Sequence, residues 1–245
     1  MSNSLKLTGI ILSESEYSEY GKRLVILTKE KGRITAFARS ARKQNNPLTG
    51  VTMPFIFGVF DVFAGRDAYS LNSVEVKDYF EGLRKDLDAV CYAAYFSELT
   101  EYFSVDEHSD RELLNLLYVT FKAMLSGKIS KKLIRSIFEI KLLQIEGFGV
   151  NVFSCSSCGS EEGHFFKAEL GGIICDECRS SGERLIHLKD STLYTLQYIY
   201  STDLKRLYSF TVSEEVEKNL VEICRDLSDT FIEKKMKSLE MLELI

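Results

Sequence analysis

The chain has 245 residues, is 45% hydrophobic, and carries 31 Lys and Arg against 36 Asp and Glu, a formal net charge of −5. A chain of this size and composition can bury a full core, which excludes extensive disorder and favours one or two domains. No stretch reaches the roughly 18 to 20 consecutive apolar residues of a membrane helix, and Lys6 and Thr8 interrupt the apolar start at residues 5–12. We therefore expect a cytoplasmic protein without a membrane partner.

The charge is divided unevenly along the chain. Residues 1–80 contain eleven Lys and Arg against eight Asp and Glu, a net charge of +3, and residues 81–245 contain twenty against twenty-eight, a net charge of −8. This asymmetry suggests a surface for a polyanion in the first part and surfaces for other partners in the second.

Short strands with turn signals between them are expected in the first 76 residues. The predicted strands are residues 5–12, 23–28, 33–40, 55–63 and 69–76. The polar, glycine-containing residues 29–32 indicate a hairpin turn, and Gly58 indicates a bend or bulge inside the fourth strand. Five short antiparallel strands lose their exposed edges when they close into a barrel, so we predict an OB-like barrel.

A dense group of cations lies on this strand region. From residue 22 to residue 43 only Glu30 opposes eight cations, which are Lys22, Arg23, Lys29, Lys31, Arg33, Arg39, Arg42 and Lys43. Strand alternation over residues 33–39 sends Ile34, Ala36 and Ala38 to one face and Arg33, Phe37 and Arg39 to the other.

Cations beside an exposed ring are typical of surfaces that bind single-stranded nucleic acid, because phosphates pair with the cations and bases stack on the ring. The candidate nucleic-acid-binding residues are Lys22, Arg23, Lys31, Arg33, Phe37, Arg39, Arg42, Lys43 and Arg66, the last at a hairpin tip. The polar loop 41–50, which turns at Pro47, could order on a bound strand. The alternative is that these charges only solvate a sheet face.

Helical spacing replaces strand alternation from Leu83 onward. Apolar residues recur three and four apart, at 83–94, 113–121, 134–138, 193–200 and 216–227. Gly147 is expected to end the third of these helices. We expect Ser213 to cap the last helix, with Glu214 and Glu215 at its positive end.

Two Cys-x-x-Cys pairs interrupt the helical part. Cys155 and Cys158 are separated by sixteen residues from Cys175 and Cys178, within the spacing range of zinc sites. Each pair can direct two thiolates at one ion, and four thiolates leave no open position for catalysis. We predict one structural Zn²⁺ that stabilises an insert at about residues 151–182. The backbone freedom of Gly159, Gly171 and Gly172 allows the tight turns that such a site needs. Ordinary thiols or a disulfide are the alternative reading.

The other cysteines and His164 do not form a pattern that indicates a catalytic site. Cys91 and Cys224 lie among apolar helical residues and are predicted to be small buried hydrophobic side chains, and His164 is a less favoured ligand than the four cysteines. The phosphate-loop, dinucleotide-binding and nucleophile-elbow motifs are absent. The sequence therefore predicts a protein that is not an enzyme.

The order of these parts resembles the bacterial DNA repair and recombination mediator family RecO. The resemblance is carried by the segments TGIILSESEYSEYGKRLVILTKEKGRITAFARSAR, NPLTGVTMPF, DYFEGLRKDL with AYFSELTEYF, and EGFGV with CSSCG and GGIICDEC. It implies an α+β chain, with an OB-fold nucleic-acid-binding domain at residues 1–80 and a helical domain with the zinc-binding insert at residues 81–245.

The resemblance also implies function and partners. Members bind single- and double-stranded DNA and anneal complementary strands. With RecR and RecF they help RecA to replace single-strand-binding protein, whose C-terminal tail they contact. Such a protein would be associated with the nucleoid. The four cysteines match the zinc-bearing members, and Arg39, Arg42 and Lys43 lie on the family's basic stretch. The segments 18–21 and 45–47 depart from the family pattern.

Two other functions are consistent with the residues. One is a zinc-ribbon regulator of transcription or RNA metabolism, which would show sequence preference in duplex DNA and little annealing. The other is a structural adaptor whose barrel binds protein, which would show neither property.

Overall fold

The computed structural model describes residues 4–180, 182 and 184–242 and has an α+β fold, as predicted. Its contacts divide the chain into two compact units. The first comprises residues up to 125 together with those from 236, and the second comprises residues 126–235. The predicted limits 1–80, 81–245 and 151–182 remain predictions, and the residues 1–3, 181, 183 and 243–245 that they include lie outside the described residues.

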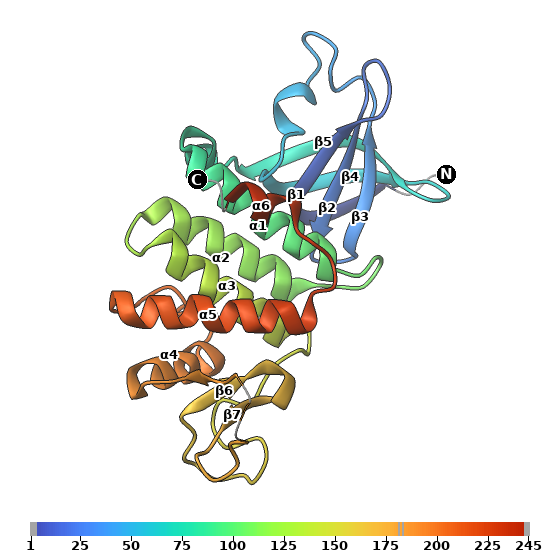
Figure 1. Cartoon of the computed structure of the whole chain (residues 1–245). Coiled ribbons are helices and arrows are strands. Elements are labelled where there is room, and N and C mark those ends of the chain that lie inside the picture. The colour runs from blue at the N-terminus through green and yellow to red at the C-terminus, as the bar shows by residue number, and fades with distance from the viewer. Residues whose placement is uncertain (1–3, 181, 183, 243–245) are drawn as a thin grey trace. The chain divides into compact units, whose positions relative to one another are not determined.

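The first unit begins with a closed five-stranded barrel, which confirms the predicted OB-fold barrel (Figure 1). Its strands are β1 (Ser4–Glu16), β2 (Lys22–Thr28), β3 (Gly32–Ala38), β4 (Phe57–Ala64) and β5 (Tyr69–Asp78), in the order β1-β2-β3-β5-β4. The neighbours pair antiparallel except for β3 and β5, which are parallel and pair at only two positions. Closure removes the open edges on which another chain could pair.

Strand alternation builds the interior of the barrel. In β3 the side chains of Ile34, Ala36 and Ala38 are buried, whereas Arg33 and Phe37 are only partly covered, as the alternation predicts. The register of β4 against β5 shifts between Phe57 and Gly58, where the irregularity was expected, and again after Asp61. These shifts bend the strands so that the barrel can close.

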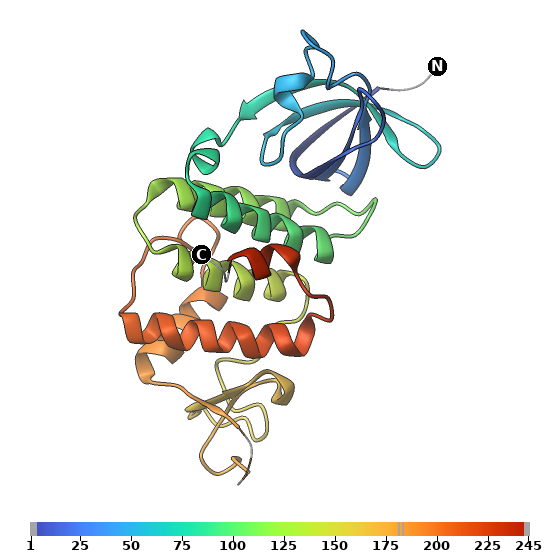
Figure 2. The same ribbon diagram turned by 45° about the horizontal axis from the view of Figure 1, so that its top comes forward.

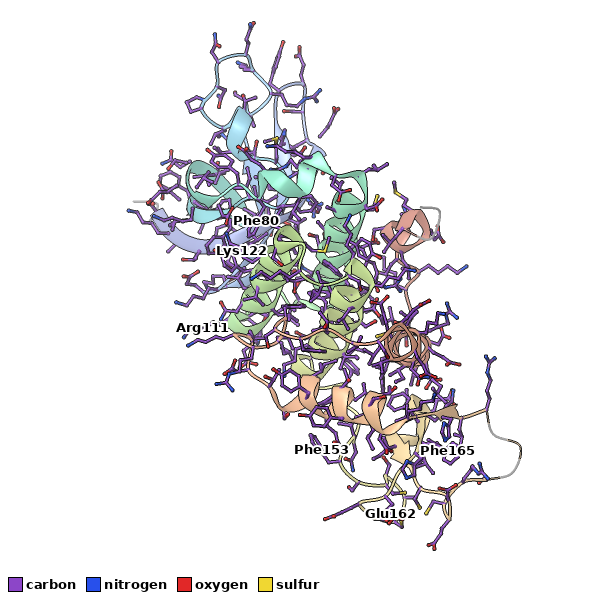
Figure 3. All side chains as sticks on the ribbon, turned by 90° about the vertical axis from the view of Figure 1, so that its left-hand side faces the viewer. Phe80, Arg111, Lys122, Phe153, Glu162 and Phe165 are labelled. Atoms are coloured by element: carbon purple, nitrogen blue, oxygen red, sulfur yellow. The ribbon has the colours of Figure 1, made fainter. Side chains whose placement is uncertain are left out.

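Helices complete the first unit. A 3₁₀ turn, η2 (Glu81–Lys85), contains Leu83 and precedes α1 (Leu87–Phe103), so the period that starts at Leu83 begins as a tighter turn than predicted. The helix α2 (Arg111–Ser126) follows, and Lys122 on it places its ammonium 5.2 Å from the centre of the Phe80 ring (Figure 3). Asp86 caps α1 by accepting a bond from the Asp88 backbone N–H.

A short helix near the C-terminus returns to this unit. It is α6 (Lys237–Leu242), which lies beside α1 in both ribbon views (Figure 1 and Figure 2). The expectation that the helix ending near residue 227 is the last one is therefore wrong. Six residues are too few to show a helical period, and α6 is held by contacts with α1 and not by its own sequence.

The second unit contains three longer helices, α3 (Lys131–Ile145), α4 (Asp190–Ser201) and α5 (Glu214–Phe231). Ser213 caps α5 by accepting the Val216 N–H, as predicted. Gly147, in a left-handed conformation with φ of 85°, ends α3, also as predicted. Within the described residues, no helix is both long enough and apolar enough to cross a membrane.

The cysteine-bearing insert contains a small sheet that the sequence did not predict. Its strands are β6 (Phe165–Lys167), β7 (Gly172–Ile174) and β8 (Ile186–His187), in the antiparallel order β7-β6-β8. Strands of two or three residues show no alternation, so a loop-rich insert was expected. The sheet positions the two cysteine pairs.

Candidate metal centre and nucleic-acid interface

The four cysteines of the insert converge on one point. The Sγ atoms of Cys155, Cys158, Cys175 and Cys178 all lie within 4.8 Å of one another, and those of Cys158 and Cys175 are 3.7 Å apart. In a tetrahedral zinc site with Zn–S bonds of about 2.3 Å, the sulfurs are about 3.8 Å apart. The cysteines therefore fit a four-thiolate metal site and form no disulfide.

Backbone turns hold each pair in place. The Gly159 N–H donates to the Cys155 carbonyl at 2.8 Å, and the Cys178 N–H donates to the Cys175 carbonyl at 3.2 Å. Gly172 has a φ of 130°, and a Cβ there would meet the Asn151 carbonyl oxygen at 2.0 Å. The glycine is required at this position because the Ile173 N–H donates to that same carbonyl, which brings the two backbones together.

The thiols differ in acidity. Burial raises the pKa of Cys155, but backbone N–H groups of Cys175, Cys158 and Ser157 outweigh burial and lower it to about 6. Hydrogen bonds from its thiol to Cys158 and Cys175 raise the pKa of Cys178 to about 12. Crowded thiols cannot all ionise unless a cation neutralises them, so this donor set suits a divalent thiolate-binding metal.

An apolar cluster and an ion pair connect the metal centre to the helices of its unit. Phe165 packs with Ile174 and the buried thiols, and the Arg179 guanidinium lies 4.6 Å from the Phe165 ring centre. The Asp226 carboxylate on α5 accepts bonds from the Lys167 ammonium at 2.6 Å and the Ala168 N–H at 2.7 Å. The insert is therefore tied to α5 through one carboxylate.

The other cysteines and His164 are not part of the cluster found among the described residues. Cys91 and Cys224 are buried, as predicted. Burial raises the pKa of Cys224 well above its usual range, which keeps this thiol protonated and unreactive. The His164 ring faces Asp190, with its Nδ1 atom 3.9 Å from a carboxylate oxygen.

The predicted nucleic-acid-binding cations lie on the barrel, but carboxylates from other segments pair with four of them. Lys22 contacts Glu14 and Arg42 pairs with Glu16 at 2.8 Å. Lys31 pairs with Glu107 at 3.0 Å and Arg33 pairs with Asp106 at 2.6 Å. The count of eight cations to one acid in the sequence therefore overstates the free positive charge of this surface.

The remaining cations have no ion pair among the described residues. They are Arg23, Lys29, Arg39, Lys43 and Arg66, of which Lys29 was noted in the sequence but not chosen as a binding residue. Arg23 stands directly opposite Phe37 across the β2–β3 pair and donates to the Thr35 hydroxyl at 3.3 Å. Arg66, at the tip of the β4–β5 hairpin, shares a hollow with Arg33 and Tyr69.

Phe37 is not the most exposed ring on this surface. It is partly buried, and the Tyr17 ring lies over it with a centroid separation of 4.1 Å. Tyr17 is 58% exposed and Tyr20 is 43% exposed, and the Lys43 ammonium lies 5.2 Å from the Tyr20 ring centre. Sequence reasoning missed both tyrosines, although each lies within five residues of the basic cluster.

Comparisons with known proteins match both the barrel region and the helical region of this chain to one protein family. A family model described as Recombination protein O N terminal matches residues 1–80, and one described as Recombination protein O C terminal matches residues 84–240. The chain is 30% identical to the DNA repair protein RecO of Alkaliphilus metalliredigens, covering 98% of this chain and 99% of that protein. It is 30% identical to that of Desulforamulus reducens, with 97% and 93% covered, and 29% identical to that of Clostridium perfringens strain 13, with 97% and 96% covered.

Proposed function

This chain belongs to the RecO family of DNA repair and recombination proteins, and we propose that it is a recombination mediator. In this proposal it binds single- and double-stranded DNA, anneals complementary strands, and with RecR helps to load RecA onto DNA coated by single-strand-binding protein. It does so by binding and alignment, without catalysing a bond-making reaction.

The observation that carries the DNA-binding part is the group of unpaired cations on the barrel. Arg39 and Lys43 follow β3 and are exposed, Arg23 lies on the strand beside it, and none has an ion pair among the described residues. Cations of this kind release counterions when they bind phosphates, which favours binding to any nucleic acid regardless of sequence. Affinity without sequence preference is what strand annealing requires.

The metal centre supports the proposal as a structural element. We propose that Cys155, Cys158, Cys175 and Cys178 hold one Zn²⁺ as thiolates, which would join two turns that are also linked by the hydrogen bond from the Ser156 N–H to the Ile173 carbonyl at 2.8 Å. Four protein ligands would leave no position for substrate, so this ion would contribute folding free energy and no catalysis.

The protein partners rest on family membership. We propose RecR, with RecF as a further partner, and the C-terminal tail of single-strand-binding protein. An acidic peptide with an aromatic end would be recognised by an apolar groove rimmed with cations in the helical part. Loss of tail binding in the full chain after charge reversal around such a groove would locate it.

The proposal is tested by reversing the charge of Arg39, Arg42 and Lys43 to Glu and titrating the protein against single-stranded oligonucleotides at several salt concentrations. The slope of log affinity against log salt should fall in magnitude by about 2 if all three side chains contact phosphates. Lys205, Lys218 and Lys235, changed to Glu in a control variant, give the same change in net charge on the second unit. Equal slopes in all three proteins would contradict the assignment.

An annealing assay separates the proposal from its alternatives. Complementary oligonucleotides should pair faster with the protein, both bare and coated with single-strand-binding protein. A zinc-ribbon regulator of transcription or RNA metabolism would instead prefer one duplex sequence and anneal poorly, and an adaptor protein would bind no DNA.

A further inference from the structure

The loop between β1 and β2 presents two tyrosines beside the unpaired cations. This loop covers residues 17–21, and hydrogen bonds from the Tyr17 N–H to the Gly21 carbonyl, 3.2 Å, and from the Gly21 N–H to the Ser18 hydroxyl, 3.0 Å, close it into a tight turn. Both tyrosines are exposed in this turn, at 58% and 43%. Exposed apolar surface rimmed by polar groups is a feature of binding sites.

The tyrosine loop is attached to the basic loop that follows β3. The Arg42 N–H donates to the Tyr20 carbonyl at 2.9 Å, and the Lys43 ammonium lies over the Tyr20 ring at 5.2 Å. Figure 1 shows these two loops, in dark and lighter blue, at the same end of the barrel. The rings and the cations of the loop after β3 therefore form one surface, although more than fifteen residues separate the two loops in the sequence.

Tyr17 packs on Phe37 in a tilted contact. Their ring centres are 4.1 Å apart and their planes meet at 41°, so Phe37 supports one side of the Tyr17 ring while Tyr17 stays 58% exposed. Arg23 stands opposite Phe37 on β2, and Arg39 follows one residue after β3. The nearby carboxylates of Glu14 and Glu16 are paired with Lys22 and Arg42, and the Glu19 carboxylate in the loop itself accepts the Tyr20 hydroxyl.

We propose that Tyr17 and Tyr20 are a base-stacking site for unpaired nucleotides, with Arg23, Arg39 and Lys43 holding the flanking phosphates. The charge of the cations selects a polyanion, and the two flat apolar rings select one that can offer free π-faces. Single-stranded DNA or RNA has both properties. Duplex DNA has the phosphates but keeps its bases stacked on each other, so it can use only the cations.

This inference rests on the proposed function, because it names the part of the DNA that the barrel recognises. It assigns the preference for single strands to the tyrosines and the affinity shared by single and double strands to the cations. It also moves the base contact from Phe37, the ring predicted from the sequence, to Tyr17, with Phe37 as its support.

The test compares three oligonucleotides of equal length with the full-length protein: a single strand, the same strand with its central bases removed to leave abasic sugars, and a duplex. Unmodified protein should bind the abasic strand more weakly than the normal strand, by roughly 5- to 150-fold for each stack lost. The salt dependence should be the same for both strands, because they carry the same phosphates.

Variants assign the loss to the named rings. Tyr17→Ala should weaken binding to the normal strand by roughly the same factor and leave duplex and abasic binding unchanged, whereas Tyr17→Phe should retain the affinity because the ring remains. Tyr194→Ala, which removes a tyrosine that is 70% exposed on α4, is the control and should change nothing. Thermal unfolding of each variant checks that the barrel is intact.

Two results would overturn the inference, and they have different meanings. Equal affinity for normal and abasic strands would show that bases are not contacted, and the proposed DNA-binding function would stand on the cations alone. No binding to any oligonucleotide at low salt would remove both the stacking site and the proposed function.

Discussion

At the scale of single residues, the ammonium group of Lys141 shows how this chain uses a buried charge. Lys141 is only 8% exposed. Its Nζ atom donates to the carbonyl oxygens of Ile199, Tyr200 and Thr202 at 3.1, 3.3 and 3.1 Å. These carbonyls lie at the C-terminal end of α4, where helical partners are missing and the helix dipole is negative. One lysine on α3 therefore caps α4.

Replacing Lys141 by Met should lower the free energy of unfolding by about 2 kcal/mol, because carbonyl groups lose their donor while the apolar volume is kept. The Tyr200 carbonyl retains the Gln144 amide at 3.0 Å, which limits the loss. Chemical denaturation measures the change. Lys218→Met, at a lysine whose side chain is 76% exposed, is the control and should change stability by less than about 0.5 kcal/mol.

The same scale shows what the sequence could and could not reveal about the site. Spacing alone predicted that the four cysteines form one cluster, since each pair is local and the two pairs need only meet. The free charge of the basic surface was not predictable, because Asp106 and Glu107 reach Arg33 and Lys31 from more than seventy residues away. Tyr17 was missed because its exposure depends on the turn at Gly21.

At the scale of elements, the segment between α1 and α2 contacts the start of β3 through isolated backbone bridges of Asp106 with Gly32 and Arg33. The Arg33 N–H donates to the Val105 carbonyl at 3.2 Å, and the Ser109 hydroxyl donates to the Lys29 carbonyl at 2.8 Å. Glu107 also accepts the Tyr69 hydroxyl at 2.6 Å, and this bond together with burial raises the pKa of Tyr69 to about 12. The carboxylates of this acidic segment therefore form ion pairs with two of the cations that were predicted to bind DNA.

Neutralising this segment should strengthen DNA binding. In an Asp106→Asn, Glu107→Gln variant, Lys31 and Arg33 are free to pair with phosphates, so the affinity for single strands should rise several-fold at low salt. The magnitude of the salt slope should increase by about 1.4, since two new phosphate contacts each add about 0.7 on a single strand. Glu161→Gln with Glu162→Gln gives the same change in net charge in the insert. An equal gain in both variants would attribute the effect to net charge alone.

The cysteine-bearing insert is expected to depend on the proposed zinc ion for its folding, whereas the barrel is not. Removing the ion with a chelator should speed hydrogen exchange in the knuckles and in β6 and β7, because three short strands cannot stay ordered without the metal. Exchange in β1 to β5 should not change. Cys155→Ser should abolish the bound zinc, and Cys224→Ser should keep it. Loss of protection in the barrel on chelation would contradict this division.

Elements were predictable from the sequence in proportion to their length. The five barrel strands and the five longer helices have seven or more residues, enough to display their period, and their positions agree with the alternation and spacing of apolar residues. The strands β6, β7 and β8 and the helix α6 were missed. They have two to six residues. The conformation of the three strands is set by the cysteine-bearing turns beside them, and that of α6 by its packing on α1.

At the scale of the whole molecule, the chain leaves the first compact unit at residue 125, builds the second, and returns at residue 236. The returning segment is anchored by Glu98 on α1. Its carboxylate accepts bonds from the Ser238 N–H at 2.9 Å, the Ser238 hydroxyl at 2.5 Å and the Lys237 N–H at 3.3 Å. Met236 is 4% exposed. An acidic side chain of one helix thus caps the first turn of another.

Replacing Glu98 by Ala should therefore release α6, because three donors at its first turn lose their acceptor and a helix of six residues is not stable alone. Hydrogen exchange should become fast in residues 237–242 and faster in α1, which loses its covering. The helices α3 and α5 of the second unit should keep their protection. Glu112→Ala, which removes an exposed acid from α2, is the control. Unchanged protection of α6 would mean that burial of Met236, and not the carboxylate, anchors the segment.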